Sequence, residues 1–237
     1  MNKEANYLYS PNCKMADMIL NDSTLLDIIR RFNIPLGFGD MNVDEVCRLH
    51  SINCRFFLII ANINTFSTYL PSVKELNLIT IDELIHYLKR SHLNYLNRRI
   101  KVIEEKLLSI SESTNGSEFK LILKFFRNYK AEVIKHFNYE ENVVFPYINS
   151  LLGKQTQAGA YSIEQYEDNH SNIDDKLSDL KNIIIKYLPY GEMTPEDLSS
   201  VNDVVKDIFT FEEDLAKHTR IENKVLIPMV HRIEEVR

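Results

Sequence analysis

Apolar residues recur three and four positions apart along most of the chain, which is the spacing that places them on one side of an α-helix. Four long stretches have this pattern, and three of them begin with a side chain that can cap free backbone N–H groups. These start signals are the capping boxes Thr80–Glu83 and Ser162–Gln165, and Thr194 followed by Pro195. Because the connections are short and each helix has one apolar stripe, the pattern predicts an antiparallel four-helix bundle.

A smaller unit precedes the predicted bundle. It contains one helical stretch that ends near Arg31 and a second that runs from about Val43 to Ile63. The segment over residues 65–78 lacks a helical pattern and is our predicted linker. We therefore expect an all-α protein, with a small helical N-terminal domain over residues 1–78 and the bundle over residues 79–237.

The composition fits a helical protein and excludes several classes. The 237 residues include only 6 Gly and 7 Pro. A formal net charge of −6 argues against nucleic acid as a partner. The longest apolar run, Phe56–Ala61, is too short to cross a bilayer, and no basic segment leads into a hydrophobic run at the N-terminus. We therefore expect a cytoplasmic protein that does not enter a membrane.

Each apolar stripe of the bundle contains one histidine, and two stripes also contain a glutamate. In chain order, the predicted inward positions are Ile81, Leu84 or Ile85, Leu88, His92, Tyr95 and Ile100; Tyr129, Val133, His136, Glu140, Val143 and Tyr147; Ile163, Tyr166, His170, Ile173, Leu177, Leu180 and Ile184; and Val204, Ile208, Phe211, Leu215, His218, Glu222, Val225 and Met229. An ionised carboxylate on a buried stripe costs several kcal/mol unless it is paired or bound to metal. Because these stripes contain no Lys or Arg, a metal cation is the simplest counter-charge.

Both glutamates belong to the same local pattern, H-x3-E-x2-V-x2-P, once from His136 to Pro146 and once from His218 to Pro228. In each, the histidine and the glutamate lie one helical turn apart and can reach the same point. One such motif is a weak signal, because short motifs recur by chance. Two at corresponding places, with a histidine on each remaining helix, indicate a metal site. The predicted ligands are His92, His136, Glu140, His170, His218 and Glu222.

The other histidines and two nearby acids complete the prediction. His50, His86 and His231 lie off the bundle stripes, so we expect them not to be ligands. Glu132 and Asp214 each precede a predicted ligand histidine by one turn, where a carboxylate could accept the ring N–H and fix its tautomer. A solvated surface acid is the equally good alternative for both.

The predicted ligands indicate which metal binds. Four imidazoles and two carboxylates suit first-row transition metals, and six ligands exceed what one tetrahedral zinc accepts. The three cysteines contain no Cys-x-x-Cys pair that would indicate a thiolate site. We expect two iron ions, bridged by both glutamates and by an oxo or hydroxo group, with an open position on each for dioxygen, nitric oxide, peroxide or water.

This constellation resembles the hemerythrin-like bundle, and the resemblance covers about residues 79–235. Within that group, Asp82–His92 is similar to the first helix of the bacterial di-iron proteins that repair iron centres, the RIC or ScdA group. In that family the counterpart of His92, and not that of His86, is the ligand.

The N-terminal unit extends the resemblance over roughly residues 15–60. Leu25–Ile34, followed by a glycine turn, is similar to the N-terminal domain of the RIC and ScdA proteins. This chain departs from them at the turn, because Gly37-Phe38-Gly39 stands where the family typically has a Cys-Cys pair.

The resemblance implies a di-iron protein that restores iron–sulfur clusters after nitrosative or oxidative stress, by donating labile iron or by reacting with nitric oxide. Iron–sulfur proteins would then be its clients. Two alternatives remain open: a module that binds or senses dioxygen or nitric oxide, and an enzyme that reduces peroxide or nitric oxide. An exposed face of the N-terminal unit could mediate dimerisation, although no feature requires an oligomer.

Overall fold

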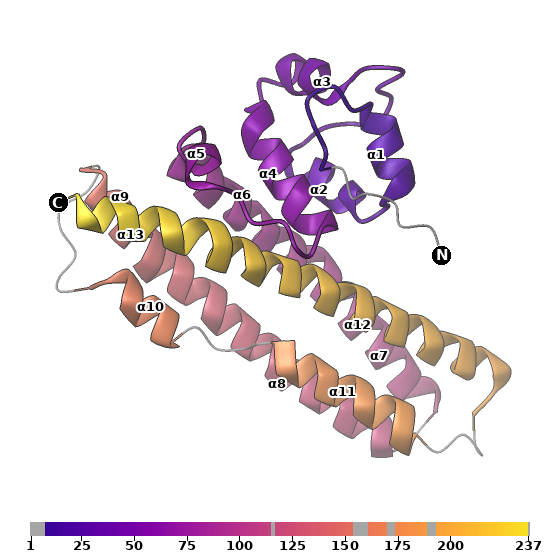
Figure 1. The fold of residues 1–237 in the computed structure, drawn as a ribbon. Helices are drawn as coiled ribbons and strands as arrows, with labels where there is room; N and C mark the ends of the chain where they lie inside the picture. Colours follow the sequence, from indigo (N-terminus) through magenta and orange to yellow (C-terminus); the bar gives the residue numbers. More distant parts are fainter. Residues whose placement is uncertain (1–7, 115–116, 154–160, 170–173, 189–192, 237) are drawn as a thin grey trace. The chain divides into compact units, whose positions relative to one another are not determined.

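The computed structural model describes residues 8–114, 117–153, 161–169, 174–188 and 193–236, and its regular elements in these ranges are helices (Figure 1). A single isolated β-bridge joins Lys14 and Asn42. The all-α prediction is therefore confirmed. Two compact units divide the chain: a central unit of His92–Ala216, and a discontinuous unit that combines Met1–Ser91 with Lys217–Arg237. The predicted domain boundary after residue 78 stays a prediction.

The central unit is a helix bundle. Its elements are the π-helical turn η1 (Tyr95–Arg99), α7 (Ile100–Ser113), α8 (Ser117–Tyr139), the π-helical turn η2 (Glu140–Val144), α9 (Phe145–Leu151), α10 (Ile163–Asn169), α11 (Asp174–Tyr187) and most of α12 (Pro195–Ile221). One hydrophobic core is shared by η1, α7, α8, α11 and α12, and its largest fully buried side chains include Tyr95, Phe126, Tyr129 and Phe211. The apolar stripes of the sequence thus face one another, as expected for a bundle.

Polar contacts along α7 and α12 establish that these two helices are antiparallel. The hydroxyl of Tyr95 donates to the carbonyl of Asp214 at 3.1 Å, and Lys106 pairs with Asp207 at 2.6 Å. Further along, the hydroxyl of Ser113 lies 2.7 Å from a carboxylate oxygen of Asp197. Positions that rise along α7 therefore meet positions that fall along α12.

The discontinuous unit contains short helices from the start of the chain and the last helices after α12. These are α1 (Met15–Asn21), α2 (Leu25–Arg31), α3 (Val43–Leu49), α4 (Cys54–Thr65), α5 (Val73–Leu76) and most of α6 (Ile81–Asn94), followed by the π-helical turn η4 (Glu222–Leu226) and α13 (Ile227–Glu235). The single helical stretch predicted from Val43 to Ile63 is wrong. It is broken at Ser51, which has a φ of 54°, and α4 restarts because the side chain of Asn53 accepts hydrogen bonds from two free backbone N–H groups.

The glycine turn between α2 and α3 requires its glycines. Gly37 and Gly39 have φ values of 108° and 56°, which residues with a Cβ rarely adopt. A residue with a Cβ at either position would be strained, so this turn has a backbone suited to glycine.

One arginine joins the end of α12 to the irregular segment that follows α4. Nη1 of Arg220 donates to the carbonyls of Ile63 at 2.8 Å and Phe66 at 3.1 Å, and Nη2 donates to those of Ser67 at 2.6 Å and Tyr69 at 2.7 Å. A single guanidinium therefore donates to four carbonyls in the last turn of α4 and just after it, which fixes this segment against α12 within the discontinuous unit.

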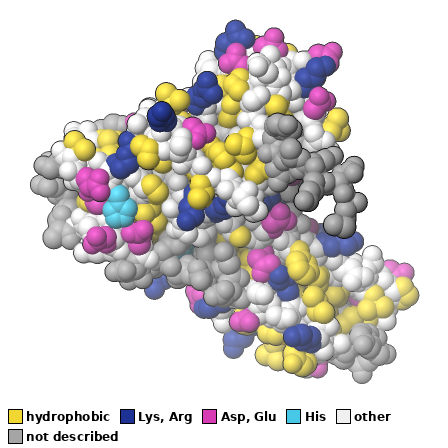
Figure 2. Space-filling model, in the orientation of Figure 1, with side chains coloured by type: hydrophobic (Ala, Val, Ile, Leu, Met, Phe, Trp, Pro, Cys, Tyr) yellow, Lys and Arg dark blue, Asp and Glu magenta, His cyan; other side chains and the backbone are white. Residues whose placement is uncertain are grey.

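The surface mixes both signs of charge. On the face drawn in Figure 2, Lys and Arg side chains are interspersed with Asp and Glu. Among the residues that the structure describes, no helix combines the length and the apolar character needed to cross a bilayer.

Candidate metal centre

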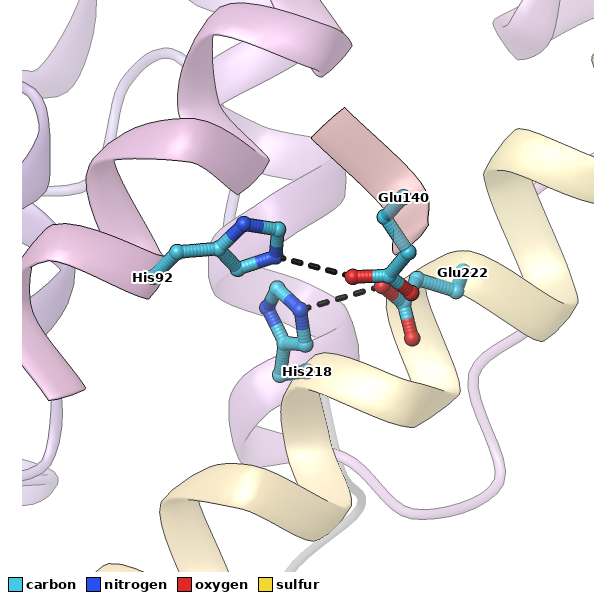
Figure 3. A group of neighbouring side chains, drawn as sticks. All are labelled: His92, Glu140, His218 and Glu222. Atoms are coloured by element: carbon cyan, nitrogen blue, oxygen red, sulfur yellow. Dashed lines mark ion pairs between the residues drawn. The ribbon is translucent and has the colours of Figure 1, made fainter. Parts of the chain in front are cut away.

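Four of the six predicted ligands lie together in the interior. They are His92 near the end of α6, Glu140 at the start of η2, His218 in the last turn of α12, and Glu222 at the start of η4. One ligand atom from each lies within 4.8 Å of the other three, and all four side chains are buried (Figure 3). In the described part of the chain, this is the one group of histidine, cysteine and acidic side chains with such spacing.

The spacing and the chemistry of these donors fit a metal ion. Nε2 of His92 lies 3.2 Å from Oε2 of Glu140, and Nε2 of His218 lies 3.0 Å from Oε1 of Glu222. Neighbouring ligands on an ion with bonds of about 2.1 Å are about 3 Å apart, so each pair is spaced like two adjacent ligands. Both glutamates have an exposed fraction of 0%. Two buried carboxylates beside two imidazoles form a donor set suited to a first-row transition metal.

His136 lies at the other oxygen of Glu140. Its Nε2 is 3.1 Å from Oε1, whereas His92 faces Oε2, so Glu140 has an imidazole at each carboxylate oxygen. Burial acts to raise the pKa of Glu140, but the hydrogen bonds and charges of His136 and His92 outweigh it and hold that pKa well below its usual range. Glu140 is therefore an ionised carboxylate that lies between two imidazoles.

Two residues that the sequence reasoning missed contact this centre. Nδ1 of His92 lies 2.9 Å from Oε1 of Glu141, and the hydroxyl of Tyr166 donates to Oε1 of Glu140 at 2.6 Å. Glu141 was overlooked because we searched for acids one turn before a histidine on the same helix, whereas Glu141 contacts a histidine on another helix. Tyr166 was predicted only as a core residue, although a fully buried tyrosine hydroxyl usually has a hydrogen-bond partner.

The remaining predicted site residues lie elsewhere. The Glu132 carboxylate forms an ion pair with Lys176, and both side chains are about half exposed. The carboxylate of Asp214 is buried and lies 3.3 Å from the hydroxyl of Tyr95. Their contacts with ligand histidines stay predictions. His170 lies outside the described residues.

The three histidines predicted not to be ligands are outside the group. His86 is exposed on α6, and His50 is half-buried at the end of α3. His231 is half-buried on α13, with its Nδ1 3.8 Å from the carboxylate of Glu234.

A wide helical turn begins at each ligand glutamate. The N–H of Phe145 donates to the carbonyl of Glu140 in η2, and that of Ile227 donates to the carbonyl of Glu222 in η4, five residues back in both cases. The next residue in each motif is a proline, which has no N–H and collides with the carbonyl four residues before it. The widened turn accommodates that proline in η2 and in η4, whereas the π-helical turn η1 is followed by Ile100.

The widened turn also overturns one predicted core position. Val143 was expected to face inward, but 37% of its surface is exposed, and Val144 is fully buried instead. A π-helical turn contains about one more residue than an α-helical turn, which fits the exchange of Val143 for Val144, although Tyr147 and, in η4, Val225 are buried as predicted.

A comparison with protein families agrees with this geometry. A family model described as the hemerythrin HHE cation binding domain matches residues 83–231, a range that contains all six predicted ligands. A search of curated proteins returns no match.

Proposed function

Because the chain belongs to the hemerythrin HHE cation-binding domain family, we propose that it binds two iron ions bridged by an oxo or hydroxo group. We propose further that it uses them to restore iron–sulfur clusters damaged by nitrosative or oxidative stress. The observation that carries the proposal is the buried group of His92, Glu140, His218 and Glu222.

The residues around Glu140 support two ions in place of one. His92 and His136 approach opposite oxygens of this carboxylate, at 3.2 and 3.1 Å. In the proposed centre, Glu140 and Glu222 would hold both ions, and His92, His136, His170 and His218 would complete the ligand set. The bound irons would supply redox chemistry and open positions for nitric oxide or dioxygen.

Aromatic side chains around His92 fix its orientation and shield it from water. The His92 ring stacks on Phe137, with ring centroids 4.1 Å apart and planes 9° from parallel. The Phe145 ring also stacks with the His92 ring, with centroids 6.1 Å apart. These apolar contacts exclude water from one side of the centre and lock the rotamer of His92, so the imidazole is preorganised to bind metal.

The repair role is supported by the resemblance of Asp82–His92 and Leu25–Ile34 to the RIC and ScdA proteins. Its chemistry would be the donation of a labile iron to a client protein in the cytoplasm, or reaction with nitric oxide.

Metal content tests the centre itself. Protein produced with iron should contain two irons per chain and show the visible absorption of oxo-bridged ferric iron. His92→Ala should lower the iron content, whereas His86→Ala, which removes an exposed histidine from the same helix, should leave it unchanged. One iron or none in the unsubstituted protein would contradict the two-iron centre.

A reactivation assay tests the repair role separately. The iron-loaded protein is mixed with an iron–sulfur enzyme that nitric oxide has inactivated, and recovery of that enzyme's activity is followed over time. Recovery should require the loaded protein and be lost with Glu140→Ala or Glu222→Ala. A protein that holds two irons but gives no recovery would refute repair and keep the metal centre.

A gas sensor is the second candidate, and Arg220 favours it. This residue lies between the ligands His218 and Glu222 in the sequence, and its guanidinium holds the segment after α4. A change at either ligand would therefore reach that segment through α12. Reversible gas binding that alters proteolysis of residues 63–69, without enzyme reactivation, would select the sensor.

A further inference from the structure

Two of the three cysteines face each other across one turn of the discontinuous unit. Cys47 lies in α3 near its end, and Cys54 is the first residue of α4. Both are free thiols, and their side chains are hydrogen-bonded to each other. They lie outside the group of side chains at the candidate metal centre. The turn between α3 and α4 therefore holds a pair of nucleophilic groups that the proposed iron chemistry does not use.

The backbone of this turn keeps the two thiols together. At the end of α3, Ser51 has a φ of 54°, and the N–H of Ile52 donates to the carbonyl of Cys47 at 2.8 Å. The next residue, Asn53, begins α4, because its side chain accepts a hydrogen bond from the N–H of Arg55 at 3.0 Å. One helix end is thus fixed directly against the next helix start, with a connection too short to let the thiols separate.

The two thiols differ in their access to solvent. Cys47 has an exposed fraction of 0%, whereas Cys54 is half-buried. Burial, together with the charge of Asp44, raises the pKa of the Cys54 thiol, although the Cys47 S–H and the charge of Arg55 act to lower it. Burial raises the pKa of the Cys47 thiol as well. An oxidant in water therefore meets Cys54 first and finds Cys47 directly behind it.

We propose that Cys54 and Cys47 form an oxidation site at which a peroxide converts two thiols to a disulfide. The sulfur of Cys54 attacks the O–O bond, so an S–O bond forms and the other oxygen leaves as water with the thiol proton. The sulfur of Cys47 then attacks that of Cys54; the S–S bond forms, the S–O bond breaks, and the hydroxyl leaves as a second water with the Cys47 proton. Two thiols lose two electrons, and one peroxide gains them.

A neighbouring thiol determines the product of this oxidation. A sulfenic acid without one can be oxidised further to a sulfinic acid, which thiols do not reduce, whereas a disulfide is reversible. Cys47 would therefore make oxidation at Cys54 reversible and would tie the end of α3 to the start of α4. Because no iron takes part, the inference stands apart from the proposed metal centre.

Peptide mapping tests the inference. The full chain is kept free of iron by a chelator, so that peroxide meets no metal, and is treated with an excess of hydrogen peroxide because the raised pKa slows the reaction. Remaining thiols are then alkylated under denaturing conditions. Trypsin cleaves after Arg48 and Arg55, so the disulfide should join the peptides Phe32–Arg48 and Leu49–Arg55, and a reductant should separate them.

Three substitutions separate the roles. Cys54→Ser should leave Cys47 as a thiol after the same treatment. Cys47→Ser should leave a sulfenic acid at Cys54, which dimedone traps. Cys13→Ser is the matched control: Sγ of Cys13 lies 3.4 Å from the backbone nitrogen of Ser10, and this variant should form the same disulfide as the unsubstituted chain.

The linked peptides decide the outcome. Their absence from the unsubstituted chain would overturn the inference, as would a disulfide between two chains in their place, or oxidation of Cys13 before Cys54. If a variant at Cys47 or Cys54 does not fold, the unsubstituted and Cys13→Ser chains still decide, because both must give the link.

Discussion

Replacing Arg220 with alanine should destabilise the protein, because its guanidinium holds four backbone carbonyls. The guanidinium donates to the carbonyls of Ile63, Phe66, Ser67 and Tyr69, and three of these four bonds are partly buried. A hydrogen bond from a charged group contributes about 1.5–3 kcal/mol when buried. Since the bonds share one donor group and are not additive, we expect a total loss of about 3 kcal/mol.

Urea denaturation of the metal-free protein, followed by circular dichroism, measures this loss without interference from metal binding. A loss of this size corresponds to a melting temperature lower by about 6–12 °C for a chain of this length. Arg220→Lys should recover less than half, because an ammonium cannot reach both pairs of carbonyls. Arg127→Ala is the control, since Arg127 forms a half-exposed ion pair with Glu104 that contributes about 1 kcal/mol or less. Equal losses for Arg220→Ala and Arg127→Ala would refute the reasoning.

Three further outcomes are expected. Burial acts to raise the pKa of Asp22, but hydrogen bonds from Thr24 and Thr65 outweigh it and leave that pKa below its usual value. Because the folded state binds this proton less tightly than the unfolded state, the free energy of unfolding should fall as the pH drops below about 4. Denaturation at a series of pH values should show a less steep fall for Asp22→Asn. Burial also raises the pKa of the Cys47 thiol, so mass spectrometry should find this cysteine alkylated at neutral pH only after denaturation. Iron at about 100 times its dissociation constant should raise the free energy of unfolding of the protein by about 2.7 kcal/mol for each occupied site. Calorimetry should show a corresponding rise in melting temperature, and this rise should disappear when a chelator removes the iron.

The helical period predicted the all-α bundle and the inward position of four candidate ligands, because a bundle buries one stripe of each helix. A polar residue on such a stripe must face the interior, whatever the details of packing. For this reason His92, Glu140, His218 and Glu222 could be selected from their positions alone, and the structure brings these four together. The same reasoning excluded His86, which is exposed.

Periodicity failed where the helix itself departs from the α form or where a contact crosses between helices. Val143 was misplaced in the widened turn at Glu140, where Val144 is the fully buried residue, and a fixed period does not anticipate such a turn. Glu141 contacts His92 and Tyr166 contacts Glu140 across helices, so these contacts depend on packing that no local spacing records. The proline after each glutamate was the available signal for the widened turn, and it was used only as part of a motif.

The discontinuous unit combines segments from both ends of the sequence, which affects the order in which the chain folds. Its hydrogen bonds from Arg220 to Ile63 and Tyr69 span 157 and 151 residues of sequence. During synthesis this unit therefore cannot be completed until most of the chain has been made. Contacts between residues so far apart in sequence slow folding. His218 and Glu222 leave the ribosome at nearly the same moment as Arg220. A nascent chain stopped before residue 217 should thus lack both the finished N-terminal packing and two of the four side chains grouped at the candidate metal centre, so the centre can form only after this late folding.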